Sequence, residues 1–218
     1  MRALITREYA EPLASMLATR RVSSIHVPCI RLVSTGNPCP VDCFESVLIT
    51  SAAVVRFVPD VKNIIGSAKV FAVGHRTAAS LTSNAVEVTY AGNGGGLEAL
   101  EYMLAQTSSN QLHIGAKDPS PGLKLALMEN RIDSWAVYKN TVPAGLQGEL
   151  SQCMYDAVVF TSGSAVRAYV DAVGTPTVPT VMLGRSTCSR AEALGVEATA
   201  VAREPTLEAL VDAVAGIR

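Results

Sequence analysis

The chain has 218 residues, of which 49% are hydrophobic and 17% charged, and its formal net charge is -1. This length can bury one large hydrophobic core or two cores of about 100 residues each. The near-neutral charge and the lack of a Lys- or Arg-rich run argue against a nucleic acid or an acidic membrane surface as the partner. The first residues do not resemble a signal peptide and no apolar run reaches about 18 residues, so we expect a soluble, cytoplasmic protein.

Side chains that commonly bind metals form no recognisable pattern. The five cysteines are odd in number and contain no Cys-x-x-Cys pair, which disfavours a disulfide framework and a zinc site alike. The three histidines share no ligand spacing. We therefore expect reduced, structural cysteines and no bound metal.

Short apolar runs alternate with runs of helical spacing along the whole chain. The expected strands are residues 3–6, 25–33 (interrupted by Pro28), 47–50, 70–73, 86–90, 112–114, 135–142, 157–161, 180–183 and 197–201. The expected helices are residues 11–21, 52–58, 76–83, 97–106, 123–131, 165–173, 187–194 and 207–215. Because parallel strands need a crossover, and a helix is the usual one, this alternation predicts parallel sheets covered by helices.

The second half of the chain repeats the first at an offset of 110 residues. Gly74 aligns with Gly184 and Thr77 with Thr187, each after an apolar run. Residues 13–27 also align with 123–137, 97–100 with 207–210, and, with one residue inserted, 49–51 with 160–162. Chance similarity among alanine-rich helices is the alternative, but the uninterrupted register favours two copies of one α/β unit. We expect a cleft between the two copies.

Hydroxyl residues follow several of the predicted strands, where a helix begins. Helix N-termini carry unpaired N–H groups and the positive end of the helix dipole, and in open parallel sheets they meet the ligand at the carboxyl ends of the strands. Each hydroxyl alone is better explained as a helix cap. As two matching sets they suit a ligand with several carboxylates, whereas the sequence lacks the phosphate-binding loops of nucleotide enzymes. The residues are Thr50, Ser51, Thr77, Thr161, Ser162, Ser186 and Thr187.

Short motifs along nearly the whole chain together resemble one enzyme family. They are ALITR (3–7), VLITS (47–51), VRF (55–57), VFAVGHRTA (70–78), VY (137–138), FTS (160–162), AVR (165–167) and LGRST (183–187). In this order and spacing they resemble uroporphyrinogen-III synthase. The residue directly after each turn glycine, His75 in the first turn and Arg185 in the second, departs from the proline that is common in that family.

The resemblance implies an α/β fold of two flavodoxin-like or Rossmann-like parallel-sheet domains, related by internal duplication and joined by a two-stranded ladder. Residues 25–33 and 135–142 would be the ladder strands. One domain would then comprise residues 1–34 and 143–218, and the other residues 35–142. The repeat alone would divide the chain near residue 109.

The resemblance also implies a lyase reaction of tetrapyrrole (haem) biosynthesis. In this reaction hydroxymethylbilane, a linear tetrapyrrole, closes to uroporphyrinogen III with loss of water and inversion of the last pyrrole ring. A monomer without a cofactor or metal is expected. Tyr138 matches the tyrosine of the family at the end of the second ladder strand and is the candidate catalytic proton donor. Arg7 and the hydroxyl residues above are the candidate substrate-binding residues.

Two other functions remain open from the sequence. One is a non-catalytic two-lobed protein that binds a small polyanion, and the other is a nucleotide-linked enzyme with paired Rossmann folds. The isomer of uroporphyrinogen that forms in the presence of the protein distinguishes them from the synthase.

Overall fold

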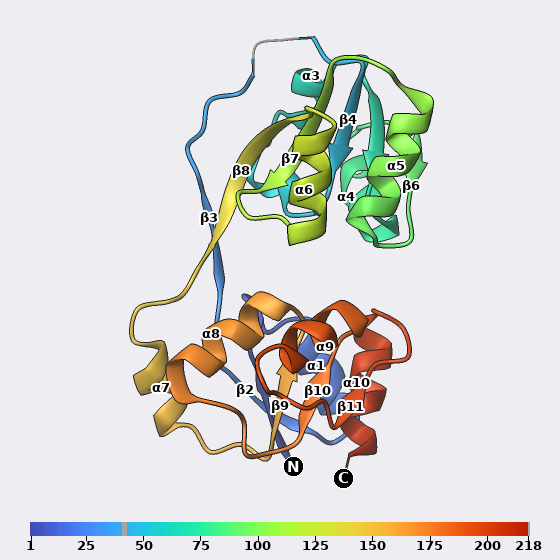
Figure 1. The fold of residues 1–218 in the computed structure, drawn as a ribbon. Coiled ribbons are helices and arrows are strands. Elements are labelled where there is room, and N and C mark those ends of the chain that lie inside the picture. The colour runs from blue at the N-terminus through green and yellow to red at the C-terminus, as the bar shows by residue number, and fades with distance from the viewer. Residues whose placement is uncertain (41–42, 218) are drawn as a thin grey trace. The chain divides into compact units, whose positions relative to one another are not determined.

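The computed structural model describes residues 1–40 and 43–217 and divides the chain into two compact units (Figure 1). Unit 1 consists of Met1–Leu32 and Asn140–Arg218, and unit 2 of Val33–Lys139. The chain crosses between them in β3 (Arg31–Ser34) and β8 (Asp133–Thr141), which are neighbours in one sheet. The boundaries predicted after residues 34 and 142 lie two and three residues further along the chain than these crossings.

Unit 1 contains a five-stranded sheet in the order β11-β10-β9-β1-β2, in which all neighbouring pairs are parallel. This is the strand order of flavodoxin-like sheets. The central strand β9 is apolar along its whole length, and β1 and β10 are apolar after their first residues, as expected of strands covered on both faces. The strands are β1 (Arg2–Ile5), β2 (Ser23–His26), β9 (Ala157–Phe160), β10 (Thr180–Met182) and β11 (Ala200–Val201).

Helices cover both faces of the unit 1 sheet. One face packs against α1 (Leu13–Thr19) and α10 (Leu207–Gly216), around Ile5 and Val159. The other face packs Val158 and Phe160 against three helices. These are α7 (Leu146–Gln152), α8 (Gly163–Val173) and α9 (Arg185–Glu192).

Unit 2 contains a six-stranded sheet in the order β3-β8-β7-β4-β5-β6. Its five strands from β8 to β6 are parallel. Strand β3 runs in the opposite direction along β8, since the Thr35 N–H donates to the Val137 carbonyl and the Thr141 hydroxyl donates to the Arg31 carbonyl. The remaining strands are β4 (Ser46–Ile49), β5 (Lys69–Ala72), β6 (Tyr90–Ala91) and β7 (Gln111–Ala116).

The unit 2 sheet is also covered on both faces (Figure 1). Leu48 and Phe71 pack against α5 (Gly96–Gln106) and α6 (Pro121–Glu129). Val47 and Ile49, which point the other way, are also buried. The helices of that second face are α2 (Val54–Phe57), α3 (Val61–Ile65) and α4 (His75–Thr82).

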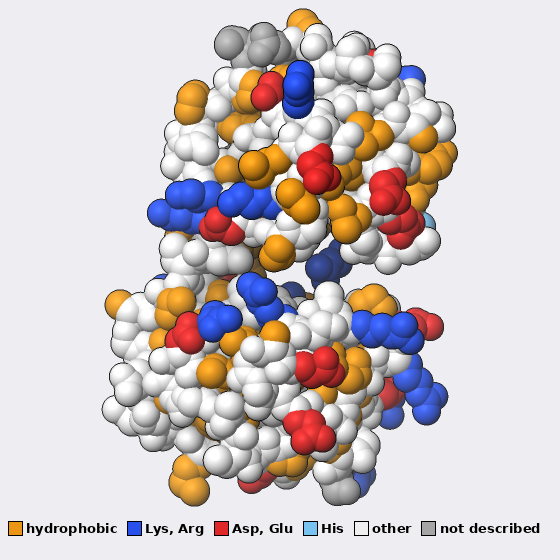
Figure 2. All heavy atoms as spheres, in the orientation of Figure 1, with side chains coloured by type: hydrophobic (Ala, Val, Ile, Leu, Met, Phe, Trp, Pro, Cys, Tyr) orange, Lys and Arg blue, Asp and Glu red, His pale blue; other side chains and the backbone are white. Residues whose placement is uncertain are grey.

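The outer faces of α5 and α6 carry apolar side chains as well, seen in orange in Figure 2. Leu97, Leu125 and Met128 are 42%, 57% and 67% exposed. Within the described ranges 1–40 and 43–217, none of the helices is long and apolar enough to cross a membrane.

The two units repeat one arrangement of strands. Read from one edge, β11-β10-β9-β1-β2 of unit 1 matches β6-β5-β4-β7-β8 of unit 2, although the chain enters the two sheets at different strands. The duplicated turns also share their backbone geometry, with φ/ψ of -172°/168° at Gly74 and -179°/176° at Gly184. The internal duplication predicted from the 110-residue offset is therefore visible in the fold.

Several element boundaries differ from those predicted. The strands expected at 86–90 and 197–201 shrink to two residues each, because the N–H groups of Val86 and Val196 donate to Leu81 and Ala191 and close the preceding helices. The extended run 25–33 is split into β2 and β3. Helices α3 and α7 were not predicted.

Candidate active site

In unit 1 the predicted binding residues lie at the carboxyl ends of adjacent parallel strands. Arg7 comes two residues after β1, and Thr161 comes directly after β9, its neighbour in the sheet. Ser162 caps α8, because its hydroxyl accepts the Ala165 N–H at 3.3 Å. The exposed Ser186 lies in the first turn of α9, after the next strand along. The sheet therefore places these residues along one edge.

In unit 2 the corresponding edge carries Thr50 and Ser51 after β4, and Thr77 after β5. The Ser51 hydroxyl accepts the backbone N–H of Ala53 at 3.1 Å, so it tightens the turn that leads into α2. Both Thr50 and Ser51 are half-buried, and their side chains leave alternate faces of the strand.

Thr77 and Thr187 are not helix caps. Each is the third residue of its helix, the cap positions are held by Gly74 and Gly184, and the two threonines are only 5% and 4% exposed. What these turns offer to an anion is therefore chiefly the N–H groups of the first helical residues.

Tyr138 reaches the same edge of unit 2 through a β-bulge in β8. Gly115 of β7 pairs with Ala136, whereas the next residue, Ala116, pairs with Tyr138, so Val137 is an extra residue in β8. A shift of one residue moves every following side chain to the other face of the sheet. The bulge therefore turns Tyr138 away from the α5 and α6 face and toward α2.

Two side chains hold the Tyr138 phenol in place. Its ring stacks on Phe57 of α2, with centroids 5.4 Å apart and planes inclined by 22°. Its hydroxyl forms a hydrogen bond with the Ser51 side chain. Burial raises the pKa of Tyr138, and the bond to Ser51 opposes that shift. At neutral pH the phenol keeps its proton and can donate it.

His113 of β7 lies on the other face of the unit 2 sheet from Tyr138, and its ring contacts side chains on both neighbouring strands. Its Nε2 lies 3.0 Å from Thr50 Oγ1 and its Nδ1 lies 2.7 Å from Ser134 Oγ of β8. The ring is fully buried, and burial lowers the pKa of His113 to about 4. A Cβ at Gly115 would lie 2.5 Å from Thr50 Oγ1, so the glycine makes room for this contact.

An arginine beside α8 was missed from the sequence. Gly163, the first residue of α8, lies against the aliphatic part of the Arg190 side chain of α9. A Cβ added at Gly163 would be 2.5 Å from the arginine Cγ. The matching contact in unit 2 joins the Ser80 hydroxyl to the Ala52 carbonyl at 3.5 Å. Gly163 and Arg190 thus take the positions that Ala52 and Ser80 hold in the other repeat. Comparing the two halves of the sequence could have identified Arg190 as a candidate.

Phe57 and His113 were also missed as functional candidates. Phe57 lies in a motif that identifies the family, but its contact with Tyr138 depends on the bulge. His113 interrupts the apolar run of β7, and a polar residue inside a buried strand was the signal for it.

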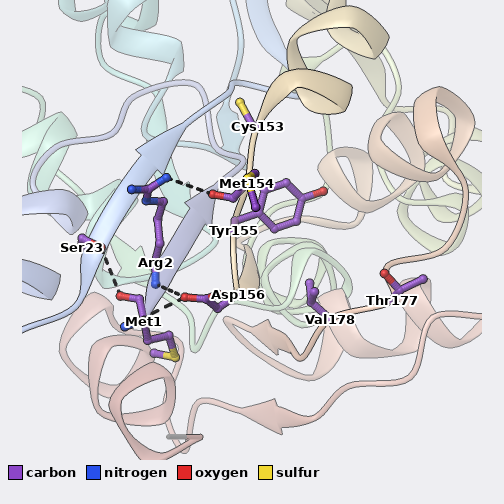
Figure 3. A pocket seen from close by; sticks show the side chains of 9 residues that line it. All are labelled: Met1, Arg2, Ser23, Cys153, Met154, Tyr155, Asp156, Thr177 and Val178. Carbon is purple, nitrogen blue, oxygen red and sulfur yellow. Dashed lines mark hydrogen bonds and ion pairs between the residues drawn. The ribbon is translucent and has the colours of Figure 1, made fainter.

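A cavity of about 760 Å³ lies at the opposite, amino-terminal edge of the unit 1 sheet (Figure 3). Its polar groups already bind one another: the Arg2 backbone N–H donates to Asp156 Oδ2 at 2.7 Å, and its guanidinium donates to the Met154 carbonyl at 3.3 Å. Ligand loops of parallel sheets occupy the carboxyl edge. We therefore place the candidate site at the strand-end turns and not in this cavity.

Acid should destabilise the protein partly through His113. Its pKa falls from 6.5 to about 4 in the folded protein, so between these values the unfolded chain binds a proton that the folded chain does not. The free energy of unfolding is therefore unaffected by His113 above about pH 6.5. As the pH falls toward 4, protonation of His113 in the unfolded chain lowers it by up to ~3 kcal/mol.

The measurement is the fall in Tm between about pH 7 and pH 4. His113→Gln should show a smaller fall than the wild type, and His75→Gln, at an exposed histidine, should show the same fall as the wild type. Equal falls for the wild type and His113→Gln would contradict this origin of the pH dependence.

In the part of the chain that the structure describes, no three side chains of His, Cys, Asp or Glu are grouped to hold a metal ion.

Known proteins are similar to this chain over nearly its full length. The family model described as uroporphyrinogen-III synthase HemD matches residues 11–212. The crystal structure of uroporphyrinogen-III synthetase from Helicobacter pylori has a TM-score of 0.71 at 18% identity and covers 100% of both chains. A mutant uroporphyrinogen III synthase from the extremely thermophilic bacterium Thermus thermophilus has a TM-score of 0.68 at 16% identity, covering 97% of this chain and 96% of that one. No curated protein matches the chain by sequence.

Proposed function

Because this chain belongs to the uroporphyrinogen-III synthase HemD family, enzymes of tetrapyrrole synthesis, we propose that it closes hydroxymethylbilane to uroporphyrinogen III. The reaction expels water and inverts the last pyrrole ring, which makes the enzyme a lyase. The observation that carries the proposal is the buried phenol of Tyr138, held by Ser51 and Phe57 at the carboxyl edge of β4. We propose further that the enzyme is a cytoplasmic monomer that uses no cofactor.

Tyr138 acts as the general acid in this proposal. Its phenol donates a proton to the departing hydroxyl, so that the C–O bond breaks and water leaves. The phenolate regains a proton when the attacked pyrrole carbon loses its own on ring closure, so the enzyme ends the cycle unchanged. The raised pKa of Tyr138 keeps the donor protonated at neutral pH, and the stacked Phe57 fixes the plane of its ring.

The substrate carries eight carboxylates, and the strand-end turns of each unit taken by itself offer donors that suit a carboxylate. In unit 2 these are the Thr50 hydroxyl and the first N–H groups of α4, beside Thr77. Ser51 lies in the same turn, and its hydroxyl is bonded to Tyr138. In unit 1 the donors are Arg7, Thr161, Ser162 and the α9 turn with Ser186 and Thr187. Arg190, whose stem lies against Gly163, adds a positive charge near the start of α8. Proximity and orientation of the bilane then supply most of the rate, since the substrate is itself reactive.

The product isomer tests this function. Hydroxymethylbilane closes spontaneously to uroporphyrinogen I, so the purified protein is incubated with freshly generated bilane and the isomers are separated by chromatography. We expect isomer III to dominate, and isomer I alone in a reaction without protein. Isomer I alone in both reactions would refute the synthase function and favour a polyanion-binding protein.

A further inference from the structure

His113 lies where it can set the direction of the hydrogen bond at Thr50. It belongs to β7, and its register partners are Leu48 of β4 and Ser134 of β8. Thr50 follows Leu48 by two residues and therefore projects from the same face. The three polar side chains form one row across adjacent strands, with both imidazole nitrogens engaged.

The lengths of the two contacts favour one assignment of donor and acceptor. A hydroxyl donor makes shorter hydrogen bonds, typically about 2.7–2.8 Å, than an N–H donor, typically about 2.9–3.0 Å. The 2.7 Å contact to Nδ1 fits a Ser134 hydroxyl that donates to the ring, and the 3.0 Å contact fits an Nε2–H that donates to Thr50 Oγ1. A neutral buried ring carries one proton, and with this assignment of donors the proton lies on Nε2.

Unit 1 lacks this row. Thr161 is the residue of unit 1 that corresponds to Thr50. Two positions before Thr161, Val159 pairs with Ile5 of β1, just as Leu48 pairs with His113 in unit 2. Ile5 therefore stands where unit 2 has the histidine. Ile5 is apolar and fully buried, so it can make no hydrogen bond to Thr161. The histidine therefore occurs in the unit that also contains Tyr138.

We propose that His113 is a positioning residue: its Nε2–H occupies an acceptor site of Thr50 Oγ1, so that the Thr50 hydroxyl directs its own proton to a substrate carboxylate. Ser134 fixes the tautomer by donating to Nδ1, and Gly115 leaves the space in which the contact forms. This role rests on the proposed function for its substrate, whereas the tautomer is a property of the protein alone.

The tautomer is tested first, without substrate. In protein labelled with 15N at histidine, NMR shifts separate a protonated from an unprotonated ring nitrogen. We expect His113 to show a protonated Nε2 and an unprotonated Nδ1 at neutral pH. The reverse assignment would overturn the inference whether or not the protein is a synthase.

Two amide variants then separate the two ends of the ring. In His113→Gln the side-chain amide takes the place of Nε2 and can still donate to Thr50, whereas in His113→Asn it takes the place of Nδ1 and reaches only Ser134. Both variants remain polar, so their stabilities should fall together. We expect kcat/KM for isomer III to fall about tenfold in His113→Asn, the size of one hydrogen bond to a charged group, and to stay near the wild-type value in His113→Gln.

A double-mutant cycle with Thr50→Val completes the test. Thr50→Val should lose activity to the same degree as His113→Asn, and the double variant should lose no more than either single one, because both remove the same donor. Two results would overturn the positioning role. One is a loss of kcat/KM in the double variant equal to the product of the two single losses. The other is equal kcat/KM for His113→Gln and His113→Asn at equal Tm. If the wild type forms only isomer I while the NMR result holds, the synthase function fails and the tautomer stands.

Discussion

Replacing Tyr138 by phenylalanine should slow the formation of uroporphyrinogen III by about 100-fold or more, the usual contribution of a general acid. The change removes only the hydroxyl, so the ring still stacks on Phe57 and the fold should persist. Because the bilane also closes without the enzyme, lost catalysis appears as a shift of product from isomer III to isomer I. The measurement is the initial rate of isomer III formation, with Tm as the check on folding.

Tyr102→Phe is the matched control for this experiment. Tyr102 lies in the same unit, on α5, is 44% exposed, and stacks on Tyr90 with centroids 3.9 Å apart. The same loss of a phenol hydroxyl there should leave the rate unchanged. If Tyr138→Phe keeps the wild-type rate, Tyr138 has no part in the chemistry, and the proton must come from another group or from water.

Gly115→Ala should lower both stability and activity, although it adds only one methyl group. The new Cβ would lie 2.5 Å from Thr50 Oγ1 and 2.7 Å from His113 Nε2, distances at which an atom must move. Overpacking of this kind costs about 1–3 kcal/mol, which in a chain of this length lowers Tm by about 2–4 °C per kcal/mol. Displacement of Thr50 should reduce kcat/KM as well.

Gly148→Ala is the control for Gly115→Ala. Gly148 lies within α7, and a Cβ there meets nothing within 4 Å. Alanine stabilises a helix interior by about 0.5–1 kcal/mol relative to glycine, so Tm should rise slightly and the rate should stay the same. A Gly115→Ala protein as stable and active as the wild type would show that β7 accommodates the methyl group and that the Thr50–His113 contact is not tightly constrained.

The sequence was informative where apolar runs and turn glycines govern the structure. The strands before Gly74 and Gly184 and the helices after them could be predicted, because their periodicity and the 110-residue repeat reflect local geometry. Helices α3 and α7 were missed because residues that usually mark loops surround or interrupt them: Pro59 and Gly66 flank α3, and Pro143, Gly145 and Gly148 lie before or within α7.

The geometry around Tyr138 could not be predicted by the same reasoning. Its orientation depends on one extra residue in β8, and a bulge of this kind leaves no periodic signal. The family resemblance pointed to Tyr138, but neither Phe57 nor the row through His113 follows from spacing along the chain. Thr77 and Thr187 matched the pattern of helix caps, whereas their burial became visible only once the helices were placed against their sheets.

Binding of the tetrapyrrole at the carboxyl ends of the strands is tested most directly by amide NMR of the 15N-labelled protein. The titrant is uroporphyrin III, the stable oxidised form of the product, which keeps all eight carboxylates. The expected result is shift changes at Thr50, Ser51 and the turn from Gly184 to Thr187. Changes confined to Met154, Asp156 and their neighbours in the cavity of Figure 3 would place the ligand at the other edge of the sheet and contradict the proposed site.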